Sequence, residues 1–268
     1  MMKDKWRLLL DAPADGAWNM AVDAALCAMA ESDDATPVLR LYGWSRPTLS
    51  VGYAQNVETD VDPEYLHSHN IDLVRRPTGG RAVLHWDEIT YSVVIPASDR
   101  HYGSLRVMYE TVARALKTAL RDMGLAVDED SVKEYAKNPC CFATRTRHEI
   151  SVMGRKVVGS AQRRSKKAAL QHGSVILTMD TCAYLSCLRF TDPRRREEAA
   201  LGLGGINSLP YIKIKADEGR NAIIRAFERV LEAGFMDSLL TPEEEELAKE
   251  MTENFMVSAM NENQPHNV

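Results

Sequence analysis

Residues 75–96 read RRPTGGRAVLHWDEITYSVVIP, and this stretch decides the fold. Two runs within it, RAVLHW (81–86) and ITYSVVIP (89–96), are rich in apolar and β-branched residues and therefore predict strands. Only Asp87 and Glu88 separate the two runs, so we expect them to form a hairpin-like pair. The middle of the chain is thus predicted to contain a β-sheet.

Further strands and helices lie on both sides of this stretch. Short apolar or alternating runs predict strands at residues 37–44, 48–53, 71–76, 148–153, 156–162 and 169–179. Stripes of apolar residues at helical spacing, with capping residues, predict helices at residues 18–29, 62–69, 104–124 and 222–231, and a further one starting at Thr241. The pattern predicts an α+β fold, a mixed β-sheet flanked by helices.

The overall composition excludes several classes of protein. The 268 residues contain 33 Lys and Arg against 38 Asp and Glu, a formal charge of −5, which argues against a general nucleic-acid binder. No apolar run approaches the ~20 residues that span a bilayer, and Leu8–Leu10 is too short for a signal-peptide core. We therefore expect a cytoplasmic protein without a membrane partner.

The cysteine pattern indicates neither a disulfide framework nor a zinc site. The five cysteines are odd in number, two are adjacent and none forms a CxxC pair; they are Cys27, Cys140, Cys141, Cys182 and Cys187. Cys140 and Cys141 follow Pro139, with Arg145, Arg147 and His148 close behind, and such cations can lower the pKa of a thiol and make it nucleophilic. The alternative is two buried cysteines packed beside Phe142.

Two other segments carry candidate functional residues. Gly79 and Gly80 would let the backbone approach a ligand and turn N–H groups toward an acyl carbonyl or a phosphate, although a plain glycine turn is an equal alternative. Lys156 follows Gly154 and lies among valines, where it can donate to a developing oxyanion. From composition alone, however, a solvated edge lysine is the better interpretation. His172 begins another strand, and a lone histidine there is more often structural.

Taken together, these motifs resemble the lipoate–protein ligase and octanoyltransferase superfamily, which includes biotin protein ligases. The resemblance covers about residues 5–180 and rests on five segments in order: GAWNMAVD (16–23), LYGW with PTLSVGYAQ (41–55), RRPTGGRAVLH (75–85), GRKVVGSAQRR (154–164) and LQHGSVIL (170–177). The GGRAVLH motif and a Cys-Phe pair ahead of the next hairpin look most like the cysteine-dependent octanoyltransferases. Those enzymes move an octanoyl group from acyl carrier protein to a lysine of a lipoyl domain, typically that of the glycine-cleavage H protein.

The resemblance also implies roles for individual residues. Cys141 matches the acyl-accepting cysteine, and Lys156 matches the lysine that contacts the acyl carbonyl. The substrate-binding positions it implies are Arg76, Gly79, Gly80, Arg81, His85, Gly159, Ser160, Ala161 and His172. From the whole sequence we expect a catalytic domain over residues 1–212, a C-terminal helical extension over 213–260 packed on it, a disordered tail over 261–268, and no cofactor or metal.

The sequence departs from the family pattern in two places. After the cysteine the family usually has Pro-Ser and then Tyr-Glu, where this chain has Arg145-Thr146-Arg147-His148-Glu149, and Cys140 is an additional thiol. Two alternatives to the transferase follow from the same motifs. An ATP-dependent lipoate ligase would prefer a third glycine where this chain has Arg81. A non-catalytic scaffold would need neither Cys141 nor Lys156.

The expected partners are acidic, and so is this chain overall. An octanoyl-acyl carrier protein donor would therefore need a local basic patch for docking. The candidates flank the predicted thiol and hairpin and are Arg145, Arg147, Arg163, Arg164, Lys166 and Lys167. The alternative is a solvated basic run without a role.

Overall fold

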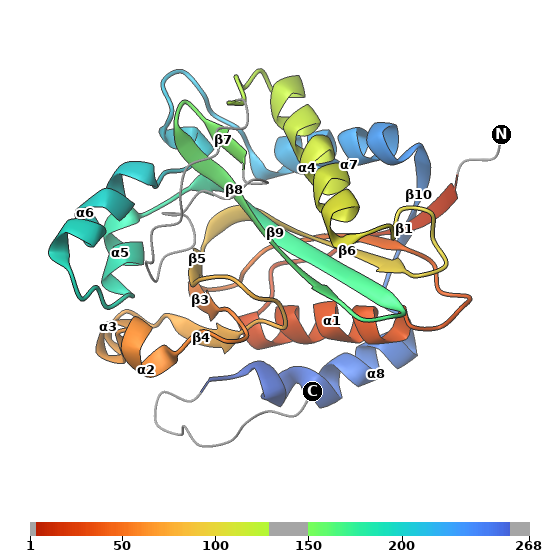
Figure 1. Ribbon diagram of the computed structural model, residues 1–268, viewed down its shortest axis with the longest axis horizontal. Coiled ribbons are helices and arrows are strands. Elements are labelled where there is room, and N and C mark those ends of the chain that lie inside the picture. The colour runs from red at the N-terminus through yellow and green to blue at the C-terminus, as the bar shows by residue number, and fades with distance from the viewer. Residues whose placement is uncertain (1–3, 129–149, 258–268) are drawn as a thin grey trace.

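A seven-stranded sheet forms the centre of the computed structural model, which describes residues 4–128 and 150–257 (Figure 1). Its strands lie in the order β10-β1-β2-β6-β9-β8-β7. Their bounds are β1 Asp4–Leu10, β2 Val38–Tyr42, β6 Asp87–Pro96, β7 Ile150–Val152, β8 Arg155–Arg164, β9 Ala168–Thr178 and β10 Ala233–Ser238. The pairs that β1 makes with β10 and β2 are parallel, whereas β2–β6, β6–β9, β9–β8 and β8–β7 are antiparallel. The predicted mixed sheet is confirmed.

A second, three-stranded sheet stands beside the first in the order β4-β3-β5. Its strands are β3 Thr48–Val51, β4 Asp72–Arg75 and β5 Val83–His85. The expected hairpin of β5 and β6 is therefore wrong. β5 pairs with β3, while β6 pairs with β2 and β9, so the chain crosses from one sheet to the other between His85 and Asp87. The sequence marks two strands there but not their partners.

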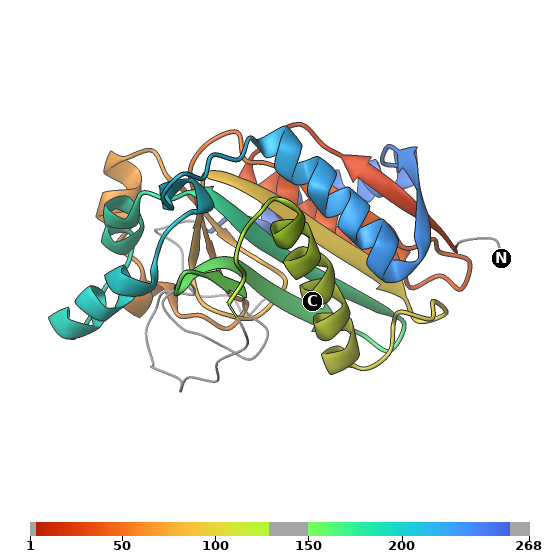
Figure 2. The same cartoon turned by 90° about the horizontal axis from the view of Figure 1, so that it is seen from above.

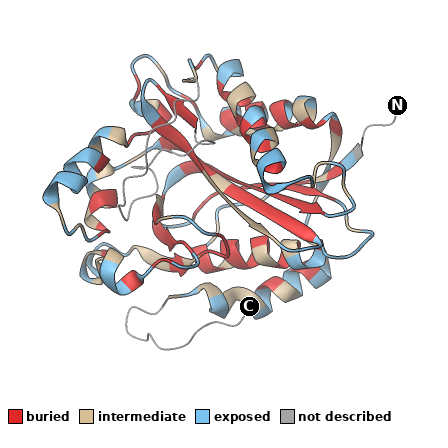
Figure 3. Ribbon diagram, viewed as in Figure 1, coloured by how far each residue is buried: buried red, intermediate tan, exposed pale blue. Residues whose placement is uncertain are grey.

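Helices cover both faces of the main sheet (Figures 1 and 2). On one face lie α4 (Leu105–Asp122) and α7 (Ala216–Leu231), and on the other α1 (Gly16–Met29) is backed by α8 (Pro242–Met251). The remaining helical segments are α2 Val57–Asp60, α3 Pro63–Ser68, α5 Thr181–Ser186, α6 Pro193–Gly202, η1 Ile206–Ser208 and η2 Thr252–Phe255. The layers bury β2, β6 and β9 almost throughout their length, whereas β10 at the edge of the sheet is mostly half-buried or exposed (Figure 3).

The predicted helix starts are confirmed by their caps. Asp15 accepts from the Trp18 N–H at the start of α1, and Ser104 accepts from the Val107 N–H at the start of α4. Thr241 and Glu244 form a capping box on α8, in which each side chain accepts from the other's backbone N–H. Such caps satisfy backbone donors that a helix start leaves without partners, which is why short polar side chains mark these positions.

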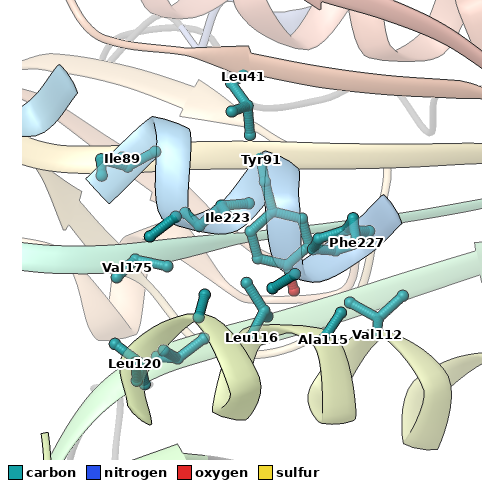
Figure 4. Packing of buried hydrophobic residues seen from close by; sticks show 14 of the residues in the cluster. Leu41, Ile89, Tyr91, Val112, Ala115, Leu116, Leu120, Val175, Ile223 and Phe227 are labelled. Atoms are coloured by element: carbon teal, nitrogen blue, oxygen red, sulfur yellow. The ribbon is translucent and has the colours of Figure 1, made fainter. Parts of the chain in front are cut away.

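The main core lies between the sheet and the α4–α7 layer. Ile89, Tyr91 and Val175 point from β6 and β9 toward Leu116 and Phe227 of the two helices (Figure 4). Because side chains alternate along a strand, the neighbours Thr90, Ser92 and Ser174 point to the opposite face, toward α1. That second face carries the buried polar groups and is the one that forms the site.

Candidate functional site

The site is a cavity on the α1 side of the main sheet, here called the central cavity. It has an empty volume of about 460 Å³, part of which opens to solvent. Seven of the nine substrate-binding positions that the resemblance implies line it: Arg76, Gly80, His85, Gly159, Ser160, Ala161 and His172. The remaining two, Gly79 and Arg81, lie in the same loop but do not line the cavity. Segments that are almost a hundred residues apart in sequence thus meet around one space.

The glycine loop over residues 76–81 is held from inside by Arg76. Its guanidinium donates to the carbonyl of Gly79 at 2.8 Å, to that of Arg81 at 2.7 Å and to that of Ser50 at 3.1 Å. Gly80 has a φ of +98°, and a Cβ on it would lie 2.7 Å from the Arg76 guanidinium. Only glycine adopts this backbone readily, so the second of the two glycines is a requirement of the loop.

His85 is fixed between a carboxylate and a hydroxyl. Its Nδ1 lies 2.8 Å from Glu88 Oε1 and its Nε2 lies 2.8 Å from Ser50 Oγ, while the ring stacks on Trp44 with centroids 4.0 Å apart. The Glu88 carboxylate accepts the hydrogen bond from the Nδ1 proton, and the Ser50 hydroxyl completes the contacts of the ring at Nε2. The His85 ring therefore has one orientation at the cavity.

Glu88 is the centre of the polar wall behind His85. Its Oε1 also accepts from Thr90 Oγ1 at 2.5 Å, from Ser174 Oγ at 2.6 Å and from Trp44 Nε1 at 3.2 Å. Burial alone would raise the pKa of Glu88, but the charge and hydrogen bond of His85 with the two hydroxyls hold it below its ordinary value. Glu88 is thus a carboxylate buried behind the cavity wall.

His172, on β9 of the main sheet, repeats this arrangement. Its Nδ1 lies 2.9 Å from Asp23 Oδ2 of α1, and its Nε2 accepts from the Thr78 hydroxyl at 2.6 Å. Burial lowers the pKa of His172 below its ordinary value, against the opposing effect of the Asp23 carboxylate. A neutral His172 therefore ties the glycine loop to the sheet and to α1.

Asp23 is in turn held by Arg40. The Arg40 guanidinium is fully buried and donates to Asp23 Oδ1 at 2.8 Å and to Asp11 Oδ2 at 2.6 Å. Burial would raise the pKa of Asp23, but the hydrogen bond to His172 and the Arg40 charge lower it overall. Neither Asp23 nor Glu88 was predicted from the sequence as a site residue. The available signals were Asn19 and Asp23 four residues apart on an apolar helix, and Glu88 three residues after His85.

Lys156 is completely buried, with 0% of its surface exposed. The interpretation as a solvated edge lysine is therefore wrong. Its orientation follows from a bulge in β8, because Ile150 pairs with Val158 and Ser151 with Lys156, which leaves Val157 as an extra residue. Val157 and Val158 both join the α4–α7 core, and Lys156 consequently takes the opposite face of β8, although it is not among the residues that line the central cavity.

The predicted nucleophile lies outside the described residues. Cys140, Cys141, Arg145 and Arg147 all fall within residues 129–149, and the predicted disordered tail begins beyond residue 257. Of the described cysteines, Cys27, Cys182 and Cys187, none lines the central cavity. Burial raises the pKa of Cys27 to about 11 and that of Cys187 to about 12, so neither supplies a thiolate at neutral pH.

The structure describes four residues of the predicted basic patch, and they surround the turn between β8 and β9. Lys166 and Lys167 are exposed and Arg163 is half-buried. Arg164 donates to the carbonyls of Tyr102 and Gly103, at 3.0 and 2.7 Å, and lies over the Tyr102 ring. Arg164 therefore has a structural role at the start of α4.

The described part of the chain holds no cluster of three or more His, Cys, Asp or Glu side chains arranged to bind a metal ion. Within the same residues, every helix is too short or too polar to cross a bilayer.

Comparison with known proteins gives consistent matches. Residues 15–228 match the family described as the lipoyl protein ligase A/B catalytic domain. The chain is 37% identical to an octanoyltransferase LipM of Kyrpidia tusciae, covering 96% of this chain and 98% of that one. It is 35% identical to octanoyltransferase LipM of Bacillus subtilis, with coverages of 94% and 96%.

Solved structures of ligases share the architecture. A lipoate-protein ligase A bound with ATP aligns with a TM-score of 0.78 and 27% identity, covering 93% of this chain and 94% of that one. A bipartite lipoate protein ligase of Thermoplasma acidophilum, described with its E2 lipoyl domain, gives the same TM-score and identity over 94% and 93% of the two chains.

Proposed function

This chain belongs to the lipoyl protein ligase A/B catalytic-domain family, and we propose that it transfers an octanoyl group to a lipoyl-domain lysine through a cysteine thioester. Octanoyl transfer in lipoate biosynthesis is the activity of the enzymes it matches over nearly their whole length, and the chain is an acyltransferase of this kind. The observation that carries the proposal is the central cavity, which gathers seven of the nine positions implied by the family motifs.

The central cavity suits an acyl chain with a reactive carbonyl at one end. Met20, Trp44 and Val83 supply apolar walls, and Gly159, Gly173 and Ser174 keep the sheet surface free of bulk. A Cβ on Gly173 would lie 2.2 Å from the carbonyl oxygen of Gly159, so the strands approach too closely there for any side chain. Lys156, buried on the same face of β8, is the proposed donor to the oxyanion.

The proposed reaction has two steps. The Cys141 thiolate attacks the carbonyl carbon of the donor thioester, a new C–S bond forms, and the donor sulfur leaves as a thiolate that takes up a proton. The deprotonated lysine amine of the acceptor then attacks the same carbon. An amide C–N bond forms, the C–S bond breaks, and Cys141 leaves as a thiolate. The nitrogen, which is positively charged after the attack, loses one proton to water and becomes the amide N–H. No ATP is consumed, because the donor is already an activated thioester.

Proposed partners are an octanoyl-acyl carrier protein as donor and a lipoyl domain as acceptor, such as that of the glycine-cleavage H protein. The E2 lipoyl domain described with the Thermoplasma ligase supports an acceptor of this class.

Intact-mass measurement after mixing with octanoyl-acyl carrier protein tests the proposal. We expect a covalent octanoyl adduct that forms without ATP, disappears in Cys141→Ser and persists in Cys140→Ser, since a serine hydroxyl has a far higher pKa than a thiol. Lys156→Met, which retains most of the side-chain volume, should lower the rate of adduct formation by roughly 10²–10³. ATP-dependent adenylate formation would instead identify a ligase, and neither product would identify a scaffold.

A further inference from the structure

A second cavity, here called the side cavity, is lined by residues from α3, β5, β9 and α5 and from the segments between them; α3, α5 and β5 lie toward the left of Figure 1. Its empty volume is about 740 Å³, part of it open to solvent, which makes it larger than the central cavity. The side chains that matter for its chemistry are Tyr65, Leu84, Trp86, Glu88, Ile176 and Asp180. Leu84 and Ile176 fall within two of the motifs, but none of these six residues is among the nine implied substrate-binding positions.

The two cavities share their walls. Val83 and His85 of β5 line the central cavity, while Leu84 between them lines the side cavity, as strand alternation requires. Along β9, Ser174 lines the first and Ile176 the second, two residues further on the same face, which is a step of about 7 Å. Along β9, the lining of the side cavity therefore begins about one side-chain length from the lining of the central cavity.

The lining of the side cavity is acidic and aromatic around an aliphatic interior. Glu88 and Asp180 are carboxylates and His69 is the one basic side chain among the described residues that line it, which include no Lys or Arg. The second oxygen of Glu88, Oε2, is buried and receives no hydrogen bond from the described part of the chain. Trp86, 56% exposed, offers its ring, and Leu84 and Ile176 supply apolar surface.

This combination fits one kind of group, a primary ammonium on an aliphatic stem. Carboxylates and the face of a tryptophan attract the ammonium, and the apolar side chains cover the methylenes. We propose that the side cavity receives the acceptor's lysine side chain as an ammonium, which gives one proton to water before its amine attacks the acyl carbonyl. This inference rests on the proposed function, in which a lysine is the acyl acceptor.

Asp180→Asn is the sharpest variant for testing this inference. Asp180 caps α5 by accepting from the Ala183 N–H at 2.9 Å, and asparagine caps equally well while it removes the charge. Asp192→Asn is the control, because Asp192 also caps a helix, α6, and does not line the side cavity. Trp86→Leu removes the ring, and Trp86→Phe restores an aromatic face.

The probe is Nα-acetyl-lysine methylamide, added to enzyme preloaded from a small octanoyl thioester. We expect Asp180→Asn and Trp86→Leu each to raise the probe concentration for half-maximal transfer about three- to tenfold. Trp86→Phe should recover much of that loss and Asp192→Asn should resemble the parent. n-Butylammonium should compete with the probe and n-butanol should not. Hydroxylamine, a neutral nucleophile without a stem, should deacylate all the variants at similar rates.

Two results would overturn the inference. One is an unchanged dependence on the lysine probe in both Asp180→Asn and Trp86→Leu, and the other is an equal loss with hydroxylamine, which would place the effect on the acyl-enzyme itself. If no acyl-enzyme forms, the proposed function fails separately. Binding is then judged by tryptophan fluorescence, where a saturable response to n-butylammonium that is absent in Trp86→Phe supports the cation site and no response refutes it.

Discussion

At the scale of the residue, the site depends on histidines whose protons are placed by buried carboxylates. His85 with Glu88 and His172 with Asp23 each present Nδ1 to a carboxylate and Nε2 to a hydroxyl, from Ser50 and Thr78 respectively. Such pairs fix the orientation of each ring. The cavity lining is thereby organised before any substrate arrives.

Burial of neutral His172 predicts a definite dependence of stability on pH. Because the folded protein lowers the pKa of His172, the unfolded chain binds the proton first as pH falls below about 6.5. The free energy of unfolding should therefore decrease with falling pH, by at most about 1.4 kcal/mol per pH unit from this group. Denaturant unfolding between pH 7.5 and 5 should show a shallower slope for His172→Gln than for the parent.

The exposed His67, in the last turn of α3, provides the control for this measurement. His67→Gln should retain the parental slope. Parallel curves for His172→Gln and the parent would mean that His172 already carries its proton in the folded protein.

At the scale of the element, the glycine loop separates two neighbouring residues that look equivalent in sequence. A Cβ on Gly79 would meet nothing within 4 Å, whereas Gly80 combines a φ of +98° with a close approach to Arg76. We expect Gly79→Ala to leave stability and acyl transfer within a small factor of the parent. Gly80→Ala should lower the melting temperature and weaken transfer, because the loop must move to relieve the strain.

Thermal melts and rates of adduct formation on the two alanine variants check this difference. Equal effects at the two positions would show that the loop backbone adapts and that Arg76 does not hold it rigidly.

The helices and strands differ in how well the sequence predicts them. Helices α1, α4 and α8 were predictable because their starts depend on local caps at Asp15, Ser104 and Thr241. The separation of β5 from β6 was not predictable, because no residue near Trp86 indicates which strand β5 or β6 will pair with. The orientation of Lys156 was hidden for the same reason. The bulge at Val157 exists only in the register of β8 against β7, so the alternation of the sequence alone puts Lys156 on the wrong face.

At the scale of the whole molecule, the net negative charge of the chain opposes the docking of an acidic donor. The chain carries a formal charge of −5, yet the proposed donor is an acidic carrier protein, which must find a locally basic surface. The described candidates are Arg163, Lys166 and Lys167 around the β8–β9 turn, since Arg164 is already bonded to the start of α4.

Reversal of Arg163, Lys166 and Lys167 to Glu should raise KM for octanoyl-acyl carrier protein and leave turnover of a small neutral octanoyl thioester nearly unchanged. Transfer from the carrier should also weaken as salt rises through about 0.1–0.2 M, where the Debye length falls below about 10 Å. Steady-state kinetics with both donors measure this. Equal losses with both would indicate that the turn supports the cavity and does not dock the carrier.

The parallel pairing of β1 with β10 has a consequence for how the molecule is made. β10, residues 233–238, forms the edge of the main sheet against β1, residues 4–10, so the first strand meets its outer neighbour only after more than two hundred further residues have been translated. Ribosomes add about 5–20 residues per second, which leaves that side of β1 uncovered for roughly ten seconds or more. Until β10 emerges, the nascent chain presents an open strand edge, the kind of surface that chaperones shield.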